Sequence, residues 1–205
     1  MPKPAFIARQ SAHPTGWFGH VVARVMALDT ARANRRVLAR LEPKPGENVL
    51  ELGCGHGRTL REIARRVAPG LAVGVDPSEV MRSVARRTLR REIAAGRARI
   101  EDGRADRVPC PDAGFDKVVS VHTLYFWPDL DAGLRELRRV LRDGGELLLA
   151  FHDGSHPAKA KELPASVYTL HRAETVADAL EAAGFHEITC EIDPDSHLSY
   201  ARARR

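Results

Sequence analysis

Three glycines at every second position, Gly53, Gly55 and Gly57, form the strongest functional signal in this sequence. They follow the apolar run 48–52, which is typical of a buried strand, and a helical pattern begins just beyond them. Glycine allows a tight turn and a close approach of backbone to ligand. A glycine triplet also fits a tight turn that binds nothing, so the loop alone leaves both interpretations open.

Asp76 favours a nucleotide-like ligand. It ends the next expected strand, 19 residues after Gly57, where a carboxylate can accept two hydrogen bonds from ribose hydroxyls. A purely structural aspartate before the Pro77-Ser78 helix cap is the alternative. The dinucleotide fingerprint G-x-G-x-x-G needs a glycine at position 58, which here is Arg58, so NAD fits less well.

Alternating strands and helices from residue 47 onward must position this loop. Strands are expected at 48–52, 71–75, 97–101, 115–121, 146–151, 186–192 and 197–202, and helices at 58–68, 77–96, 128–142 and 172–183. Repeated strand–helix pairs predict an α/β fold, doubly wound, with a mostly parallel sheet and helices on both faces. The last two strands, joined by a short turn, predict an antiparallel edge. Ligands of such sheets bind beyond the carboxyl ends of the strands, where the glycine loop lies.

Residues 1–42 are expected to form an N-terminal helical extension packed on a core domain of residues 43–205. Segments 21–28 and 37–41 carry amphipathic helical patterns. Trp17 and Phe18 precede them, in a chain with only 5% aromatic residues. Two such large rings need a surface to cover.

Length and composition describe one globular domain. The chain has 205 residues, of which 43% are hydrophobic and 29% charged, which suits a single sizeable core. No apolar run approaches the roughly 20 residues that span a bilayer, and residues 1–10 lack the apolar segment of a signal peptide, so a cytoplasmic protein without a membrane partner is expected. The net charge of +5 is spread along the chain and is nearly all arginine, which favours a solvated surface over a nucleic-acid partner.

Cysteine and histidine spacings do not predict a metal centre. The three cysteines are odd in number and widely spaced, so they form neither a disulfide framework nor a CxxC pattern. His152 and His156, four residues apart in an expected loop, give at most an incomplete metal shell. We therefore expect no metal.

Four separate stretches resemble the class I S-adenosylmethionine-dependent methyltransferases, in the small-molecule branch of the ubiquinone and menaquinone methyltransferases. They are Val49–Gly57, Gly74–Ser78 with Met81, Pro109–Val119 and Arg139–Gly145. Four motifs in the right order are more specific than any one of them. The resemblance covers about residues 47–145 and implies a Rossmann-like, seven-stranded sheet of order 3-2-1-4-5-7-6. It also implies S-adenosylmethionine as cofactor and S-adenosylhomocysteine as product.

Carried over position by position, the resemblance implies a set of cofactor residues. Glu51 is implied to hold the methionine ammonium, Asp76 to bind the ribose hydroxyls, and Met81 to pack near adenine. The full set is Glu51, Gly53, Cys54, Gly55, Gly57, Asp76, Pro77, Met81, Arg104, Ala105 and His122, the last through its carbonyl rather than its imidazole.

One position departs from the family pattern. Family members usually carry an acid near the adenine amino group, but this chain has Arg104 within Gly103-Arg104-Ala105. Asp102 or Asp106 is the hypothetical source of that carboxylate.

Methyl transfer is an in-line displacement at a carbon activated by a sulfonium, so the protein mainly holds acceptor and methyl in near-attack geometry. A base is needed only when the acceptor must lose a proton. The catalytic residue is undetermined at this stage. The candidates are His122, Tyr125 and His13, with His20 and His152 as weaker ones.

The expected acceptor is a small, partly apolar metabolite, because Trp17-Phe18 and the stretch Tyr125-Phe126-Trp127 would make a partly aromatic cover over the methyl group. Trp17, Phe18, Tyr125, Trp127 and His152 are the candidates that would contact it. Plain packing of a helix against the sheet is the alternative for these aromatic side chains.

Two other functions stay open at this point. Methylation of RNA or protein is supported only by the basic charge, and no separate recognition domain is apparent. A catalytically degenerate, cofactor-binding partner subunit is suggested by Arg104 and by the lack of a defined base. The preferred interpretation is an enzyme, working as a monomer or homodimer, that methylates a small molecule.

Overall fold

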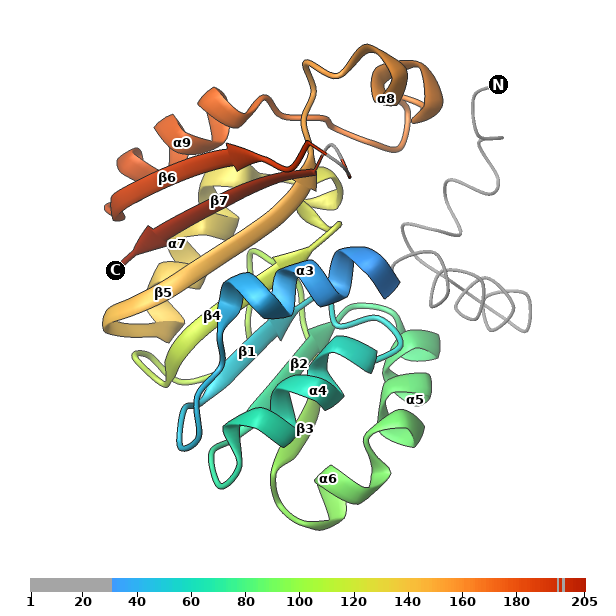
Figure 1. Cartoon of the computed structure of the whole chain (residues 1–205), viewed down its shortest axis with the longest axis vertical. Coiled ribbons are helices and arrows are strands. Elements are labelled where there is room, and N and C mark those ends of the chain that lie inside the picture. The colour runs from blue at the N-terminus through green and yellow to red at the C-terminus, as the bar shows by residue number, and fades with distance from the viewer. Residues whose placement is uncertain (1–30, 195, 197) are drawn as a thin grey trace.

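A computed structural model gives the fold, and it describes residues 31–194, 196 and 198–205. Figure 1 shows helices alternating with strands along this part of the chain. The elements are α3 (Ala31–Leu41), β1 (Val49–Leu52), α4 (Arg58–Val67), β2 (Ala72–Asp76), α5 (Glu79–Thr88), α6 (Arg90–Ala94), β3 (Ala98–Asp102), β4 (Phe115–Val121), the 3-10 turn η1 (Leu124–Phe126), α7 (Leu130–Val140), β5 (Leu141–His152), α8 (Pro157–Glu162), α9 (Ala173–Ala182), β6 (His186–Ile192) and β7 (Leu198–Arg204). His13, Trp17, Phe18, His20 and segment 21–28 lie outside the described residues.

The strands form one seven-stranded sheet in the order β3-β2-β1-β4-β5-β7-β6. β1 pairs in parallel with β2 and β4, and β7 runs antiparallel to both β5 and β6. This confirms the expected strand order and the antiparallel C-terminal edge. β1 is an interior strand between β2 and β4, and all four of its residues are buried, so the loop that follows it opens beside the ends of these two neighbours.

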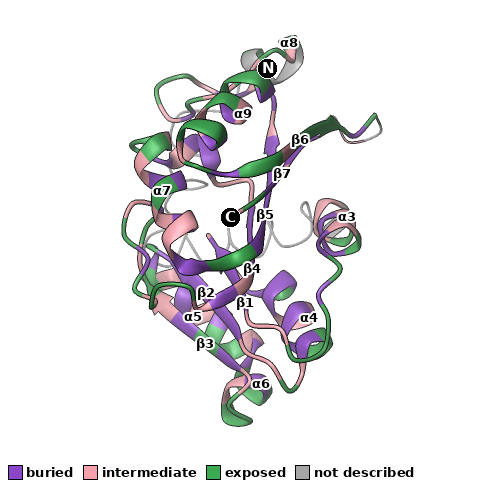
Figure 2. Cartoon of the chain, turned by 90° about the vertical axis from the view of Figure 1, so that its left-hand side faces the viewer, coloured by how far each residue is buried: buried purple, intermediate pink, exposed green. Residues whose placement is uncertain are grey.

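Helices cover both faces of the sheet. Figure 2 shows α3 and α4 on one side and α7 and α9 on the other, with buried strands between them. The two faces carry separate hydrophobic clusters, because successive strand residues point to opposite faces. On β5, for example, Leu148 packs toward α3 and α4, whereas Leu147 and Leu149 pack toward α7 and α9.

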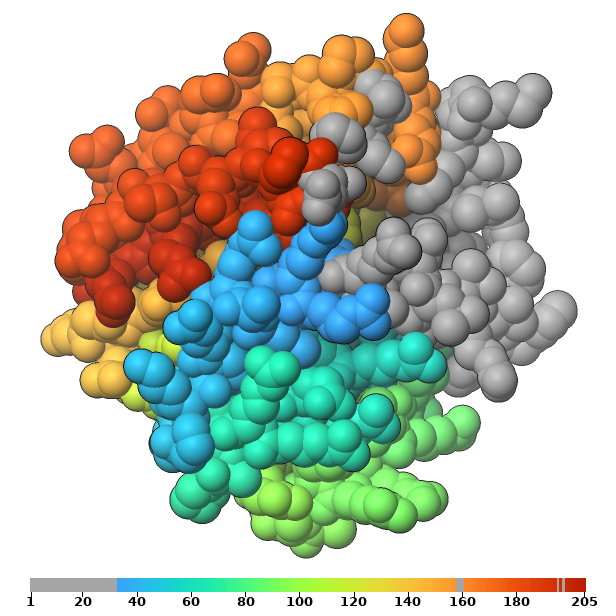
Figure 3. Space-filling view, viewed as in Figure 1, coloured from blue at the N-terminus to red at the C-terminus, as the bar shows by residue number. Residues whose placement is uncertain are grey.

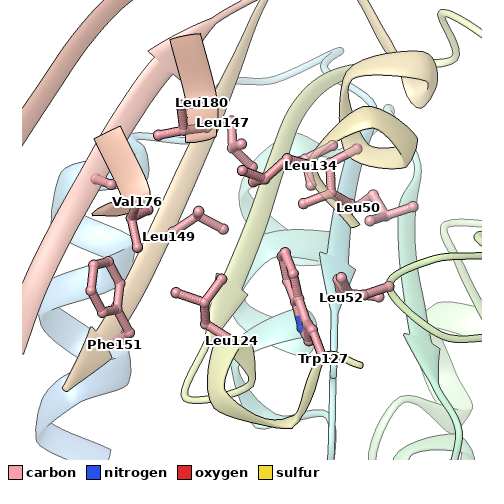
Figure 4. Packing of buried hydrophobic residues seen from close by; sticks show 14 of the residues in the cluster. Leu50, Leu52, Leu124, Trp127, Leu134, Leu147, Leu149, Phe151, Val176 and Leu180 are labelled. Atoms are coloured by element: carbon pink, nitrogen blue, oxygen red, sulfur yellow. The ribbon is translucent and has the colours of Figure 1, made fainter. Parts of the chain in front are cut away.

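The cluster under α7 and α9 is the larger of the two. Figure 4 shows Leu149 and Phe151 of β5 facing Val176 of α9, and Leu134 of α7 above Leu50 of β1. Leu134 and Val176 are fully buried, and burial of one such side chain contributes about 1.5–3 kcal/mol. The same cluster includes Trp127, so the core continues up to the loop after β4.

Ion pairs and a capping lysine fix α3 on its face of the sheet. Figure 3 shows α3 beside the C-terminal strands. The Arg40 guanidinium donates to Glu191 at 2.6 Å and to Asp193 at 3.3 Å, and it lies 4.0 Å from the ring centroid of Tyr200. At the end of the helix, Lys117 Nζ donates to the carbonyls of residues 41 and 42 at 2.6 and 2.9 Å. This satisfies carbonyl groups that a helix C-terminus leaves without partners.

Most expected boundaries lie within two residues of the observed ones, and two differences are larger. The single helix expected over 77–96 is divided into α5 and α6 at Leu89. The hydroxyl of Thr88 donates to the carbonyl of Val84 at 3.0 Å, a side-chain bond that often bends helices. β5 begins at Leu141, five residues before the expected start at 146, because Leu141 is extended and pairs with Phe115. The short helix α8 was not expected.

Three further observations concern the described residues alone. None of their helices has the length and apolar character needed to cross a membrane. No group of three or more His, Cys, Asp or Glu side chains among them is arranged to hold a metal ion. Cys54 is buried, Cys110 is partly buried and Cys190 is exposed, and all three are free thiols.

Candidate functional site

A cavity of about 530 Å³ lies beyond the carboxyl ends of the central strands. Its wall comes mainly from the loops after β1, β2, β3 and β4, which is where an open parallel sheet binds ligands. The lining residues are Asn34, Glu51, Leu52, Gly53, Cys54, Gly55, His56, Thr59, Asp76, Pro77, Met81, Arg104, Ala105, Val121, His122, Thr123, Phe126, Trp127, Pro128 and Val167. Ten of the eleven residues that the resemblance implied for the cofactor are in this set.

The glycine loop wraps the inner end of the cavity. Gly53 has φ +73°, and a Cβ there would lie 2.2 Å from the methyl group of Thr123, so no other residue fits at position 53 without a shift. Gly57, the eleventh implied residue, does not line the cavity. It has φ +76°, and a Cβ there would lie 2.5 Å from Leu89. Gly57 therefore lets α4 and α5 approach each other.

Asp76 holds two loops together at the cavity wall. Its Oδ2 accepts the backbone N–H of Gly55 and its Oδ1 accepts that of Ser78, both at 2.9 Å. Ser78 in turn caps α5 by accepting from the N–H of Met81. The structural role considered for Asp76 is thus present. A carboxylate oxygen can accept more than one hydrogen bond, which is what recognition of a diol requires.

Glu51 is a buried carboxyl group with an unsatisfied atom. Within the part of the chain described, its Oε2 is buried and has no hydrogen-bond partner. Burial, and after it the charge of Asp76, raises the pKa of Glu51 to about 8. A backbone N–H from Leu60 opposes this shift. An unpaired buried oxygen is costly, and a cationic group in the cavity would satisfy it.

The two acids considered for the adenine contact are both bound to arginines. Asp106 accepts from Arg104 at 2.6 Å, and Asp102 accepts from Arg82 at 2.8 Å. Neither acid is among the lining residues, whereas Arg104 and Ala105 are. The adenine contact by Asp102 or Asp106 stays a hypothesis.

His122 lies where β4 ends, and its surroundings are aromatic. Its Nδ1 is 2.7 Å from the phenolic oxygen of Tyr125, and its ring centroid is 5.0 Å from that of His152. Tyr125 and His152 are not among the cavity-lining residues, but both of their rings lie near the ring of His122. Burial raises the pKa of the Tyr125 phenol well above its usual value. Of the acceptor candidates, Trp127 lines the cavity, while Trp17 and Phe18 lie outside the described residues.

Sequence reasoning missed several lining residues. Val167 brings an apolar side chain to the cavity, and Asn34 reaches it from α3. Phe126, which belongs to the aromatic stretch 125–127 expected to cover the methyl group, also lines the cavity. Val167 lies in a loop without periodicity, and its place depends on tertiary contacts. Thr123 was also missed; its hydroxyl accepts from the Trp127 indole N–H at 3.1 Å.

Comparison with known proteins agrees with this geometry. Residues 49–145 match a family described as a methyltransferase domain. The chain is 32% identical over 194 residues to nocamycin O-methyltransferase of Saccharothrix syringae, an alignment that covers 80% of this chain and 68% of the relative. It is 30% identical over 178 residues to an O-methyltransferase of Pyrenophora dematioidea, covering 83% of this chain and 66% of the relative. The chain thus spans about two thirds of the length of both relatives.

The fold has counterparts among solved structures. A SAM-dependent methyltransferase from Aquifex aeolicus superposes with a TM-score of 0.70 at 20% identity, covering 83% of this chain and 88% of that one. Sequence relationship and fold agree, and the chain belongs to the class I S-adenosylmethionine-dependent methyltransferases.

The described residues fit the cofactor of this family. The unsatisfied Glu51 oxygen suits the ammonium of the methionine part, and the Asp76 carboxylate suits the two ribose hydroxyls. Met81 and Pro77 supply apolar surface beside Asp76 in the same wall. When bound, S-adenosylmethionine supplies an electrophilic methyl group on a sulfonium.

Proposed function

We propose that this protein transfers the methyl group of S-adenosylmethionine to a small, partly apolar metabolite by in-line displacement. The observation that carries the proposal is that two chemically different groups of residues line one cavity. The carboxyl groups of Glu51 and Asp76, the polar wall, come from β1 and β2, whereas Phe126, Trp127 and Val167, the apolar wall, follow β4 and β5 in the chain.

The polar wall is assigned to the cofactor. Glu51 binds the ammonium, Asp76 binds the ribose, and the backbone at Gly53 and Gly55 borders the methionine and ribose parts. The Asp76 carboxylate is already oriented by the N–H groups of Gly55 and Ser78. A group held in place before binding loses little freedom on binding.

The apolar wall is assigned to the acceptor. Trp127 is 8% exposed and its indole N–H is bound to Thr123, so the ring presents a fixed surface. Apolar surfaces of this kind with a few polar groups are typical of small-molecule sites. The printed names of the two relatives describe O-methyltransferases, which supports an oxygen atom as the methyl acceptor.

A macromolecular acceptor is less well supported. Among the described lining residues, Arg104 is the sole arginine or lysine, and it is paired with Asp106. Proteins that bind RNA contact its phosphates with arginine and lysine side chains. We therefore place the protein with small-molecule enzymes. A cytoplasmic location and a monomeric or homodimeric state are part of the proposal.

Calorimetric titration with S-adenosylmethionine, followed by an acceptor screen, tests the proposal. We expect one cofactor site per chain and release of S-adenosylhomocysteine with hydroxyl-bearing metabolites. Absence of cofactor binding at near-millimolar concentration would contradict both the site and the enzyme. Cofactor binding without product from any metabolite, together with methylation of RNA or a protein, would refute the small-molecule acceptor.

A further inference from the structure

We propose that copies of this chain associate head to tail, with an acidic stripe on α9 of one copy docked against an arginine stripe on α5 and α6 of the next. The arginine stripe consists of Arg87, Arg90 and Arg91, and the acidic stripe consists of Glu174, Asp178 and Glu181. This inference goes beyond the proposed function and is independent of it, because neither stripe is among the described residues that line the cavity.

Arginines occur all along the chain, but their balance with acidic residues is uneven. Residues 79–99 hold seven arginines and two glutamates, and their net charge of +5 equals that of the whole chain. Residues 173–194 hold six acidic residues and neither arginine nor lysine. The chain therefore has one strongly basic and one strongly acidic segment, which its overall charge does not reveal.

The arginine stripe lies on the outer side of α5 and α6. All three arginines are exposed, and none of them has an ion pair among the described residues. Residues three and four apart share a face of a helix, and like charges at this spacing repel each other. Helical hydrogen bonds continue through Leu89, across the division between α5 and α6. Residues 1–30 contain a single acidic residue, which cannot balance three arginines.

The acidic stripe follows one face of α9. Its members are four and three residues apart, and all three side chains are exposed. Glu174 lies 3.3 Å from Arg172, whereas Asp178 and Glu181 have no ion pair within the part of the chain that the structure describes. Glu181 is in the last turn of the helix, which has no basic residue, although the helix dipole favours a cation there. A basic partner would relieve both unfavourable features.

The acids of the neighbouring strand β6 have arginine partners within the chain. Glu187 lies 3.0 Å from Arg204, and Glu191 lies 2.6 Å from Arg40. These pairs compensate the charge of β6, so α9 is the element of this segment that offers uncompensated carboxylates to a partner.

The two stripes are too far apart to neutralise each other within one chain. α5 and α6 pack beside β3, and α9 packs beside β6; these strands are the two edges of the sheet. Six strand spacings separate the edges, about 29 Å, whereas exposed charges are screened beyond about 8 Å at physiological salt. Figures 1 and 2 show α9 and α6 at opposite ends of the molecule. The opposite charge for each stripe must therefore come from another molecule, and a second copy of this chain supplies it for both.

The geometry of the stripes determines the kind of assembly. The acidic stripe spans about 10 Å along its helix, a length that flexible arginine side chains can follow. Because the two docking surfaces differ, the contact is heterologous, and a homodimer keeps one stripe of each kind open. The homodimer is the first product, and longer head-to-tail assemblies follow as the concentration rises. Exposed ion pairs are individually weak and sensitive to salt, so the association is reversible.

Sedimentation velocity of the full chain at several protein concentrations measures this association. We expect the average sedimentation coefficient to rise with concentration in about 20 mM salt and to return to the monomer value in about 0.5 M salt, because added salt shortens the screening length. A coefficient that does not depend on concentration in low salt would overturn the proposal. Binding of an RNA duplex to such a monomer through the arginine stripe would assign the stripe to a nucleic-acid partner instead.

Charge reversal identifies the two docking surfaces. The first variant combines Arg87→Glu, Arg90→Glu and Arg91→Glu, and the second combines Glu174→Lys, Asp178→Lys and Glu181→Lys. Both introduce residues that are good helix formers. We expect each variant alone to stay monomeric in low salt, because its two stripes carry the same charge. An equimolar mixture of the two variants should associate, which separates a lost contact from a misfolded chain.

A third variant controls for the change in net charge. It combines Arg35→Glu, Lys44→Glu and Arg107→Glu, which replace exposed basic residues outside the arginine stripe. Its net charge equals that of the first variant, and we expect it to associate like the wild type. Loss of association in this control, or a mixture of the two stripe variants that stays monomeric, would overturn the proposal. These measurements need neither cofactor nor acceptor, so their failure would leave the proposed function standing.

Discussion

Glu51 and Asp76 are two carboxyl groups in the wall of one cavity, and the charge of Asp76 acts on the pKa of Glu51. Asp76 accepts two backbone N–H bonds, whereas Oε2 of Glu51 has no hydrogen-bond partner among the described residues. Burial, and after it the charge of Asp76, raises the pKa of Glu51 to about 8. At neutral pH the protonated form of Glu51 is therefore favoured in the protein without ligand.

Binding of the cofactor should release a proton from Glu51. At pH 6.5 the Glu51 carboxyl is protonated, and an α-amino group, with a pKa of about 7.7–8.0, is also protonated. An ion pair between them requires the carboxylate, so close to one proton leaves. Calorimetry at pH 6.5 in buffers of different ionisation enthalpy measures this number. Glu51→Gln should release none and bind at least tenfold more weakly, and equal heats in all buffers would refute the prediction.

The same pKa shift predicts how stability depends on pH. A carboxyl whose pKa rises from 4.5 to about 8 on folding stabilises the folded state fully below pH 4.5. This contribution is lost as pH rises toward 8. The side chain of Glu51→Gln cannot ionise, so the variant does not lose stability in this way as the pH rises. The melting temperature of the variant should therefore rise relative to that of the wild type between pH 5 and pH 8. Thermal unfolding without cofactor measures the difference. A constant difference over this range would show that Glu51 is not shifted.

Asp76→Asn should weaken both the site and the fold. An asparagine side chain keeps one accepting oxygen but places an amide N–H₂ against the N–H of Gly55 or Ser78. We expect a loss of about 1–3 kcal/mol in the free energy of unfolding and at least a tenfold loss in cofactor affinity. Chemical denaturation and calorimetry provide the two values. Asp143→Asn is the control, because its exposed pair with Arg205 contributes little; a similar loss there would argue against a specific role for Asp76.

Gly53→Ala separates backbone strain from steric overlap. Gly53 and Gly144 have nearly equal φ values, +73° and +71°, but only the Cβ at 53 meets a neighbour within 4 Å, the Thr123 methyl at 2.2 Å. Gly144→Ala should therefore lower the free energy of unfolding by about 1–2 kcal/mol because of φ alone. Gly53→Ala should lower the free energy of unfolding further and should also abolish cofactor binding. Urea denaturation of both variants tests this. Equal costs, or unchanged binding in Gly53→Ala, would show that the loop adjusts freely.

The strands were the most predictable part of the fold. Residues 115–121 and 186–192 form strands with the expected bounds, the first because a central parallel strand needs apolar residues toward both faces. The division at Leu89 was not predictable from apolar periodicity, since Leu89 and Ile93 continue the pattern. Just before the division, the Thr88 hydroxyl donates to the Val84 carbonyl, a local bond that apolar periodicity does not reveal.

The site residues at the ends of strands could be predicted from the sequence, whereas those in other segments could not. Glu51, Gly53 and Asp76 lie at strand ends, and strand order brings such ends together. Asn34 and Val167 come from segments far away in the sequence, and no local pattern indicates their place. The roles of the lining residues remain predictions that the experiments above test.

The apolar wall can be changed by substitution without altering the strands that carry the cofactor residues. Phe126 lies on a short 3-10 turn and Val167 in a loop, so neither belongs to the register of the sheet. Both side chains are only partly buried, and exchanging them leaves Glu51, Gly53 and Asp76 untouched. A combinatorial library at positions 126 and 167 should therefore change the size of the accepted molecule while the donor half of the site keeps its affinity.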